Sequence, residues 1–375
     1  MCAYMRYNST VRPNDPDPQD YAPGPQKLRR VAAAWAALFA ALLLYFFWFR
    51  SAIPARNYLL SLMPDDAQAV LFVDLDDLRR APVFTDLLAW APKPEADPQY
   101  RQFLRDTGFD YEKDLSAVAV AFEKDGPQRT FFAVVDGRFD VKKIRAYAVK
   151  NGWSQHSGRG GFFSIPRNGA AAPVHFAFLR DGRIAMSSRT DFASAVQTAL
   201  ARNSKTPESA EWRARFERVA GSPIFCLVRG EALKEYFSVA AYSQGSASRA
   251  TGGLSSPQLS SLLAQLQWMT LAGKPENDNL KIVADGESLD DASAKQLADL
   301  LSGVALLARA GLGSAKNQRQ IDAPTRQSYL ALLKSVEISR IDRGETKSVR
   351  LMFALTPALL KLIPHSASAA SPGSK

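Results

Sequence analysis

The residues most suggestive of chemistry are two aspartates, Asp74 and Asp76, at the end of the apolar stretch Val70–Val73. Two interpretations fit this spacing. Either a strand presents a catalytic carboxylate pair, or the strand simply stops where a helix begins. The second needs only local physics, because an acidic residue at a helix start accepts hydrogen bonds from the exposed N–H groups of the first turn. We therefore expect Asp76 or Asp77 to cap the following helix.

The same stretch, "VLFVDLDDL", resembles the first motif of the haloacid-dehalogenase phosphatases, in which D-x-D follows an apolar strand. In that family the first aspartate is the nucleophile and the second a general acid, with magnesium nearby, so the resemblance would assign these roles to Asp74 and Asp76. The family usually continues with Gly-Thr, where this chain has Asp77 and Leu78. It also needs a lysine and an acidic pair on further parallel strands, which we do not find. A magnesium-dependent phosphatase therefore stays the alternative.

Other chemically capable residues form no recognisable motif. His156, His175 and His365 lack the spacing of a zinc site. The Gly-rich stretch Ser157–Phe163 is followed by neither a helix nor G-K-[ST], so we expect a hairpin turn there instead of a phosphate loop. Cys226 lies in the apolar run "PIFCLV" and is expected to be a small buried hydrophobe. We therefore expect no cofactor, no metal site and no enzymatic activity.

An apolar segment near the N-terminus predicts a membrane anchor. Residues 31–49 carry no charge, and at about 1.5 Å per residue they would span roughly 28 Å, the thickness of a hydrocarbon core. A buried helix would have a polar face, and a cleaved signal peptide would have a shorter apolar run and small residues at its end. Lys27, Arg29 and Arg30 favour a cytoplasmic N-terminus. We expect a single-pass inner-membrane protein with a disordered cytoplasmic tail at 1–30 and its main domain in the periplasm or outside the cell.

The remaining chain predicts an α+β fold made of strands, hairpins and amphipathic helices. With 375 residues, of which 46% are hydrophobic, it can bury a sizeable core. Lobe 1 is expected at 50–220, lobe 2 at 221–364 and a disordered tail at 365–375. Strands are expected at 69–74, 116–122, 129–137, 162–165, 174–179 and 183–187, helices at 56–63, 77–90, 140–152 and 191–201, and polar loops at 238–257 and 311–325.

Lobe 2 repeats the pattern of lobe 1 and predicts an internal duplication with antiparallel sheets. An apolar strand, a polar corner and a helix open both halves, and the pair Asp136–Gly137 recurs as Asp285–Gly286 at the end of a strand. Chance repetition of α+β units is the alternative explanation. The two lobes could stand side by side or share one continuous sheet.

The stretches "QYRQFLRDTGFDYEKDLSAVAVAF" and "VVDGRFDVKKIRAYAVKNG" resemble uncharacterised, membrane-anchored bacterial proteins that are common in Acidobacteria. The resemblance is clearest over Leu62–Leu200, and its most specific part is "TGFDYEKDL", Thr107–Leu115. It implies an N-terminal anchor and an extracytoplasmic α+β domain, and it carries over no catalytic residue. Locally, we expect Gly108 to end one helix and Asp110 to cap the next turn.

These features predict a protein of the cell envelope that binds or scaffolds and performs no chemistry. The 47 Lys and Arg against 37 Asp and Glu give a net charge of +10 without a basic run, which argues against a nucleic-acid partner. Another envelope protein or the anionic membrane surface is the expected partner. A carrier of lipid or another apolar ligand, with a cavity between the lobes, is a further alternative.

Overall fold

A computed structural model describes ten segments of the chain: residues 55–88, 98–125, 128–156, 161–166, 172–179, 182–201, 209–235, 265–314, 321–344 and 346–362. The predicted membrane segment at 31–49, both predicted tails and the predicted loop at 238–257 lie outside these residues. Among the helices described, none combines the length and the apolar character needed to cross a bilayer.

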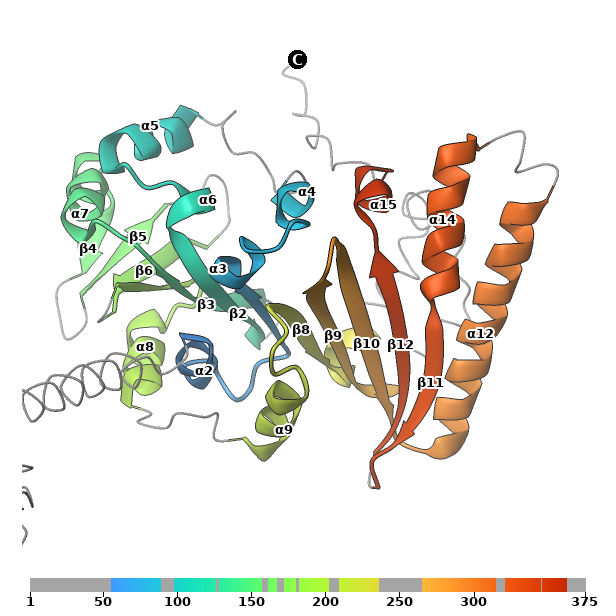
Figure 1. Ribbon diagram of the computed structural model, residues 1–375. Coiled ribbons are helices and arrows are strands. Elements are labelled where there is room, and N and C mark those ends of the chain that lie inside the picture. The colour runs from blue at the N-terminus through green and yellow to red at the C-terminus, as the bar shows by residue number, and fades with distance from the viewer. Residues whose placement is uncertain are drawn as a thin grey trace, which may run out of the picture. The chain divides into compact units, whose positions relative to one another are not determined.

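A twelve-stranded sheet runs through the described part of the chain in the order β11-β12-β10-β9-β8-β1-β2-β3-β7-β6-β5-β4 (Figure 1). Every neighbouring pair is antiparallel. The strands are β1 (Ala69–Asp74), β2 (Leu115–Asp125), β3 (Gln128–Gly137), β4 (Ser154–His156), β5 (Phe162–Ile165), β6 (Val174–Phe178), β7 (Arg183–Ser187), β8 (Ile224–Arg229), β9 (Leu266–Glu276), β10 (Asn279–Ser288), β11 (Glu337–Asp342) and β12 (Lys347–Leu355).

Helices flank this sheet, which confirms the α+β class. They are α2 (Ala55–Ser61), α3 (Leu75–Leu78), α4 (Phe84–Leu88), α5 (Pro98–Thr107), α6 (Tyr111–Asp114), α7 (Val141–Lys150), α8 (Phe192–Ala201), α9 (Ala210–Arg218), α12 (Asp291–Gly313), α14 (Ala323–Ser335) and α15 (Pro357–Leu362).

Helices cover both faces of the strands of lobe 1. Side chains alternate between the two faces of a strand, so each strand contributes to the packing on both sides. In β3, Phe132 and Val134 point toward α2 and α8 and join the main hydrophobic core. Ala133 and Val135 point the other way, toward the side of α5 and α7. Figure 1 shows α5 and α7 on one side of these strands and α2 and α8 on the other.

The two halves share one sheet through β1 and β8, so the first of the predicted alternatives, separate lobes standing side by side, is wrong. Residues Ala69–Val73 pair with Ile224–Val228, and the rings of Phe72 and Phe225 stack with their centroids 5.2 Å apart. The main core contains buried side chains from both halves, including Trp212 and Trp268. The lobes are therefore joined by main-chain hydrogen bonds and by a common core.

The strand order is the same in both directions outward from the β1–β8 junction. One side reads β1-β2-β3-β7-β6 and the other β8-β9-β10-β12-β11. The Asp-Gly pairs occupy matching places, because Asp136 pairs in register with Arg183 of β7 and Asp285 pairs with Arg350 of β12. Both pairs are also ion pairs, at 3.4 and 2.7 Å.

The predicted helix at 77–90 is wrong in its extent. The structure has two short helices instead, α3 up to Leu78 and α4 from Phe84, and residues 89–90 lie outside the described segments. Pro82 stands between them, and a proline lacks the N–H that a continuous helix needs and disfavours helical geometry in the residue before it. The segment continues over lobe 2, where Val83 packs with Leu280 and Leu360.

The polar loop predicted at 311–325 is also shorter than expected. Helix α12 continues to Gly313, and Asp322 begins α14 by accepting a hydrogen bond from the N–H of Thr325 at 3.0 Å. Residues 315–320 between them lie outside the described segments. Glycines at 311 and 313 suggested a loop, but α12 is already anchored to the sheet by Ala294 and Leu297.

Candidate functional site

The aspartate pair forms a helix cap, and the capping residue is Asp74. The Asp74 carboxylate accepts a hydrogen bond from the N–H of Asp77 at 2.9 Å, from an extended backbone conformation directly before α3. The prediction that Asp76 or Asp77 would cap is therefore wrong by a few positions, since the helix begins at Leu75. Asp76 instead pairs with Arg79 at 2.7 Å on the surface.

The surroundings of Asp74 do not resemble a phosphatase site. The strand β1 that carries it is antiparallel to both of its neighbours, whereas the resembling family places its further motifs on parallel strands. Burial raises the pKa of the Asp74 carboxyl, and no group of three or more His, Cys, Asp or Glu within the described segments is arranged to hold a metal ion. The antiparallel pairing of β1 differs from the parallel arrangement that the phosphatase alternative requires.

Replacing Asp74 by Ala should lower the free energy of unfolding by about 1 kcal/mol, because the first turn of α3 loses its cap. Asp74→Asn should retain most of that stability, because asparagine is an equally good cap. Asp76→Ala, at a side chain that is 52% exposed, should cost less than about 0.5 kcal/mol. Urea unfolding of the full-length protein in mild detergent, followed by circular dichroism, measures all three, and equal losses at both positions would contradict the assignment.

An apolar cavity of about 430 Å³, partly open to solvent, lies in lobe 1. It lies between α5 and α7 on one side and the strands β2, β3, β5, β6 and β7 on the other. All of its lining side chains are apolar, among them Phe103, Val118, Ala133, Ile144, Trp153 and Ile184. The lipid-carrier alternative expected a cavity between the lobes, but this one lies within a single lobe.

One small side chain, Ala133, leaves space on the sheet between larger apolar side chains of the neighbouring strands. Ala133 lies near the middle of β3 and reaches only a short distance toward the helices. A connected row of aromatic rings links the helices to the sheet beside it: Phe103 of α5 meets Tyr147 of α7 edge-on at 5.1 Å, Tyr147 meets Trp153 at 5.5 Å, and Trp153 meets Phe176 of β6 at 5.6 Å. Such edge-to-face contacts hold the rings in fixed orientations and so keep the space open.

The chemistry of the cavity follows from its lining. No polar side chain among the described residues lines it, so water inside would lack the two to four hydrogen-bond partners that a buried water needs. An engineered apolar cavity of about 150 Å³ stays dry and binds benzene, and typical ligand pockets range from about 300 to 1,000 Å³. The lobe 1 cavity can therefore accept an alkyl or aromatic group.

A second cluster, His156, Ser164 and His175, is brought together by β4, β5 and β6. The Ser164 hydroxyl lies 2.9 Å from Nε2 of His156 and 2.8 Å from Nδ1 of His175. Burial, and then the neighbouring His156, lower the pKa of His175. Sequence spacing did not reveal this cluster, because the contacts depend on the pairing of three strands.

The histidine cluster is poorly placed for nucleophilic catalysis. Ser164 lies within β5, whose backbone pairs with β4 on one side and β6 on the other. An oxyanion hole needs N–H groups aimed at the reacting oxygen, and the ladder already engages those around Ser164. We therefore interpret the cluster as a hydrogen-bonded row on the sheet surface.

Cys226 is half-buried and its thiol is unreactive at neutral pH. It pairs in register with Leu71 at the junction of β1 and β8. Burial raises the pKa of the thiol to about 11, and the thiolate is the reactive form of a cysteine. The interpretation of Cys226 as a small hydrophobic residue therefore agrees with its surroundings.

Comparison with known proteins yields only distant structural similarity. No protein-family model matches the sequence, and no curated protein matches it. Among solved structures, the treponemal protein TP0453 is similar in crystal forms III, IV and I, with TM-scores of 0.45, 0.43 and 0.40 and identities of 11, 10 and 10%. These alignments cover 81% of this chain and 96, 95 and 95% of TP0453. Similarity at this level does not establish a shared function.

Proposed function

We propose that this protein is a non-enzymatic binding protein that takes up an apolar molecule, or the apolar part of one, in the lobe 1 cavity. The observation that carries the proposal is the cavity itself, about 430 Å³ with a lining of apolar side chains only. An empty apolar space of that size is costly to a folded protein, because the lining atoms lose their van der Waals partners. A ligand that fills the space would recover those contacts.

The proposed location of the protein fits this ligand. The uncharged segment at 31–49 supports a single-pass anchor in the inner membrane, with a cytoplasmic N-terminus and the α+β domain in the periplasm or outside the cell. Molecules rich in alkyl groups collect in the membrane. A binding domain tethered beside the bilayer would therefore meet its ligand at high local concentration.

We also propose that the domain arose by internal duplication. Support comes from the matching strand order on the two sides of the β1–β8 junction and from the matching pairs Asp136–Arg183 and Asp285–Arg350. The residues that line the cavity all belong to lobe 1. Ligand binding would then be a property of lobe 1 that lobe 2 does not share, which leaves lobe 2 free for a partner in the cell envelope.

The test is to fill the cavity. We expect Ala133→Phe to place a ring in the space between β3 and the helices and to reduce ligand occupancy at least tenfold. Full-length protein purified from its own membranes would be extracted with organic solvent, and the bound molecules identified and counted by mass spectrometry. Ala310→Phe, at an exposed position on α12, makes the same chemical change away from the cavity and should leave occupancy unchanged.

Two results would contradict the proposed function. One is equal occupancy in wild-type, Ala133→Phe and Ala310→Phe protein, which would place the bound molecules elsewhere, for example in the detergent shell. The other is wild-type protein that carries no bound molecule and gains no thermal stability from added alkanes. A ligand that binds the native state alone must raise the melting temperature.

A further inference from the structure

A network of arginines and buried carboxylates lies where α9 meets β10 of lobe 2, and it shares no residue with the lining of the cavity. Glu287 is fully buried, and its carboxylate accepts hydrogen bonds from Arg215 of α9 at 2.6 and 3.1 Å. Arg218, one turn further along α9, also binds Glu287. The guanidinium of Arg215 lies 4.0 Å from the ring centre of Trp268, which fixes it from the other side.

Two residues before Glu287, Asp285 has its own pair of arginines. Its side chain is 6% exposed and accepts hydrogen bonds from Arg350 of β12, both at 2.7 Å, and from Arg343 at 3.0 Å. Burial alone would raise the pKa of the Asp285 carboxyl, but Arg350 and Arg343 lower it below its ordinary value. Arg343 also donates to the Ser348 hydroxyl at 2.7 Å.

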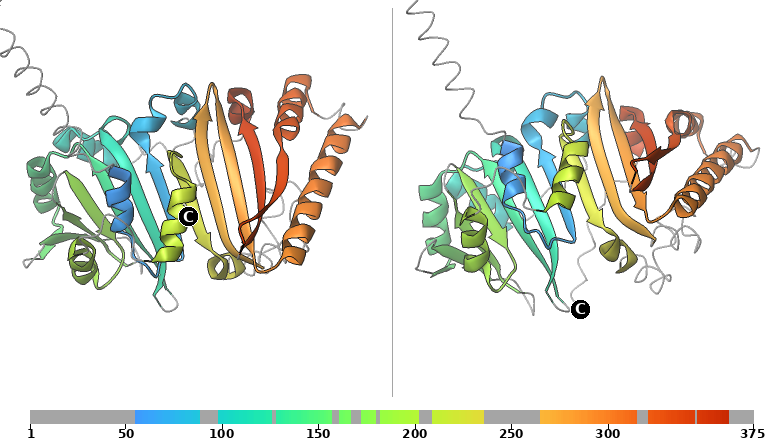
Figure 2. Two further views of the ribbon diagram at one scale, coloured as in Figure 1. Left: turned by 60° about the horizontal axis from the view of Figure 1, so that its bottom comes forward. Right: turned by 90° about the horizontal axis from the view of Figure 1, so that it is seen from below.

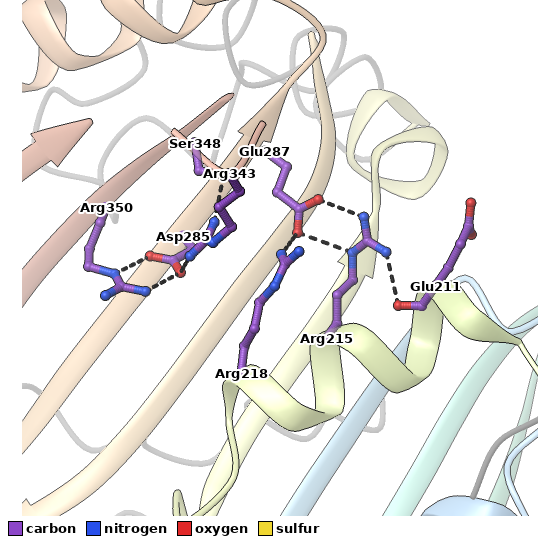
Figure 3. A network of polar contacts seen from close by, with 8 residues as sticks. All are labelled: Glu211, Arg215, Arg218, Asp285, Glu287, Arg343, Ser348 and Arg350. Atoms are coloured by element: carbon purple, nitrogen blue, oxygen red, sulfur yellow. Dashed lines mark hydrogen bonds and ion pairs between the residues drawn. The ribbon is translucent and has the colours of Figure 1, made fainter. Parts of the chain in front are cut away.

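These residues leave an excess of positive charge. Four guanidinium groups, which stay protonated in proteins, surround two carboxylates, and Figure 3 shows the two carboxylates lying between them on alternate positions of the strand. Glu211 also acts electrostatically on Arg215, but the four arginines still outnumber the three carboxylates. Figure 3 shows the Glu211 carboxylate pointing away from the cluster, and its ion pair, at 3.9 Å, is with Arg229. A network that served only to neutralise two buried acids would need two arginines.

The positive excess faces solvent. The side chains of Arg218, Arg343 and Arg350 are 25, 20 and 31% exposed, whereas both carboxylates are buried beneath them. A guanidinium carries five N–H donors. In its hydrogen bonds to the described residues, Arg218 donates only through Nη1. Arg350 makes no such hydrogen bond through Nη1, and Arg343 makes none through Nε. Donors therefore remain for an external acceptor.

Beyond α9, which contacts Glu287, no helix among the described residues covers this face of β10 and β12, whereas α8 covers the corresponding face of lobe 1. In lobe 1, α8 packs on Phe132 and Val134 of β3. Aligning the two Asp-Gly pairs places Lys281 and Val283 of β10 at these positions, and the lysine offers no apolar contact for a helix. In the left view of Figure 2, α2, α8 and α9 lie in front of the sheet while β10 and β12 are seen bare.

We propose that Arg218, Arg343 and Arg350 form a binding site for a phosphate group on the exposed face of lobe 2. The planar fork of a guanidinium binds phosphate oxygens through paired hydrogen bonds. Asp285 and Glu287 hold the arginines in place from below, so little side-chain entropy remains to be lost on binding. The phosphate can belong to a lipid headgroup or to a soluble ion, since both present the same oxygens. The proposal does not depend on the cavity.

The experiment measures phosphate binding by the full-length protein in a neutral detergent. Inorganic phosphate and dihexanoyl phosphatidic acid would be titrated separately by calorimetry against wild type, Arg218→Gln, Arg350→Gln and the control Arg105→Gln, an exposed arginine of α5. We expect saturable binding to wild type and to the control, and at least tenfold weaker binding to the two network variants. Equal affinity for both probes would assign recognition to the phosphate alone, and binding of the lipid only would assign it to a headgroup.

A second measurement uses wild-type protein alone, so it does not depend on whether the variants fold. Wild-type protein would be modified with phenylglyoxal, which reacts with accessible arginines, and the modified sites mapped by mass spectrometry. Whichever probe binds should protect Arg218, Arg343 and Arg350 at least tenfold and leave Arg105 unprotected. Absence of saturable binding by either probe, or equal protection of Arg105, would overturn the proposal. Unchanged phosphate binding in Ala133→Phe separates this site from the cavity.

Discussion

Replacing Glu287 by Gln should lower the free energy of unfolding by about 3–5 kcal/mol, the usual cost of breaking a buried ion pair from one side. The substitution removes the negative charge but keeps the shape, so the loss reports electrostatics alone. Arg215 and Arg218 would be left beside an uncharged amide, and Arg215 is itself almost fully buried. Urea unfolding of the full-length protein in detergent, followed by circular dichroism, gives the value.

The matched control is Glu276→Gln, in the same hairpin of β9 and β10. Glu276 pairs with Lys281 at 3.4 Å, and both side chains are largely exposed. Solvent screens such a pair, so its loss should change stability by less than about 1 kcal/mol. If the two substitutions had equal effects, Glu287 would not be the charge that holds α9 to β10.

Gly230→Ala should cost more than the roughly 1–3 kcal/mol typical of overpacking, and we expect little folded protein. A Cβ atom at this position would lie 2.0 Å from the carbonyl oxygen of Leu266 and 2.9 Å from Cα of Gln267. Both are backbone atoms, so no side-chain movement can make room. The junction between β8 and the start of β9 would have to separate, and that junction belongs to the centre of the sheet.

Gly303→Ala provides the comparison for the same chemical change. Gly303 lies within α12, and a Cβ atom there would meet nothing within 4 Å. Alanine is a better helix former than glycine, so this variant should gain about 0.5–1 kcal/mol. Thermal unfolding of both variants and of wild type measures the two expected changes in stability. A folded Gly230→Ala protein with an unchanged melting temperature would show that the β8–β9 junction can shift at little cost.

Features governed by neighbouring residues were predictable from the sequence. Strand β1 was expected at 69–74, where the structure has it. Gly108 does end α5, with a positive φ of 71°, and Asp110 caps α6 by accepting a hydrogen bond from the N–H of Glu112 at 3.0 Å. Asp290 likewise caps α12 by accepting a hydrogen bond from the N–H of Ser293. Alternation, caps and helix ends depend on a few residues in a row, so local rules suffice for them.

The predictions from the sequence were wrong where the outcome depended on how one element packs against another. The cap was assigned to Asp76 or Asp77, although the start of α3 made it Asp74. The carrier alternative placed a cavity between the lobes, whereas the apolar cavity in the structure lies within lobe 1, under α5 and α7. Each of these outcomes depended on where a helix came to lie, and periodicity says nothing about that.

The sequence by itself determined the α+β class, most of the strands, the end of α5 at Gly108 and the recurrence of Asp-Gly in both halves. Tertiary structure alone decided that β1 meets β8, that a cavity opens above Ala133, and that Arg215 reaches Glu287 across 72 positions of the chain. The physical reason is the range of the interactions. Local structure follows from contacts between near neighbours, whereas strand pairing, cavities and buried ion pairs depend on how the whole chain closes on itself.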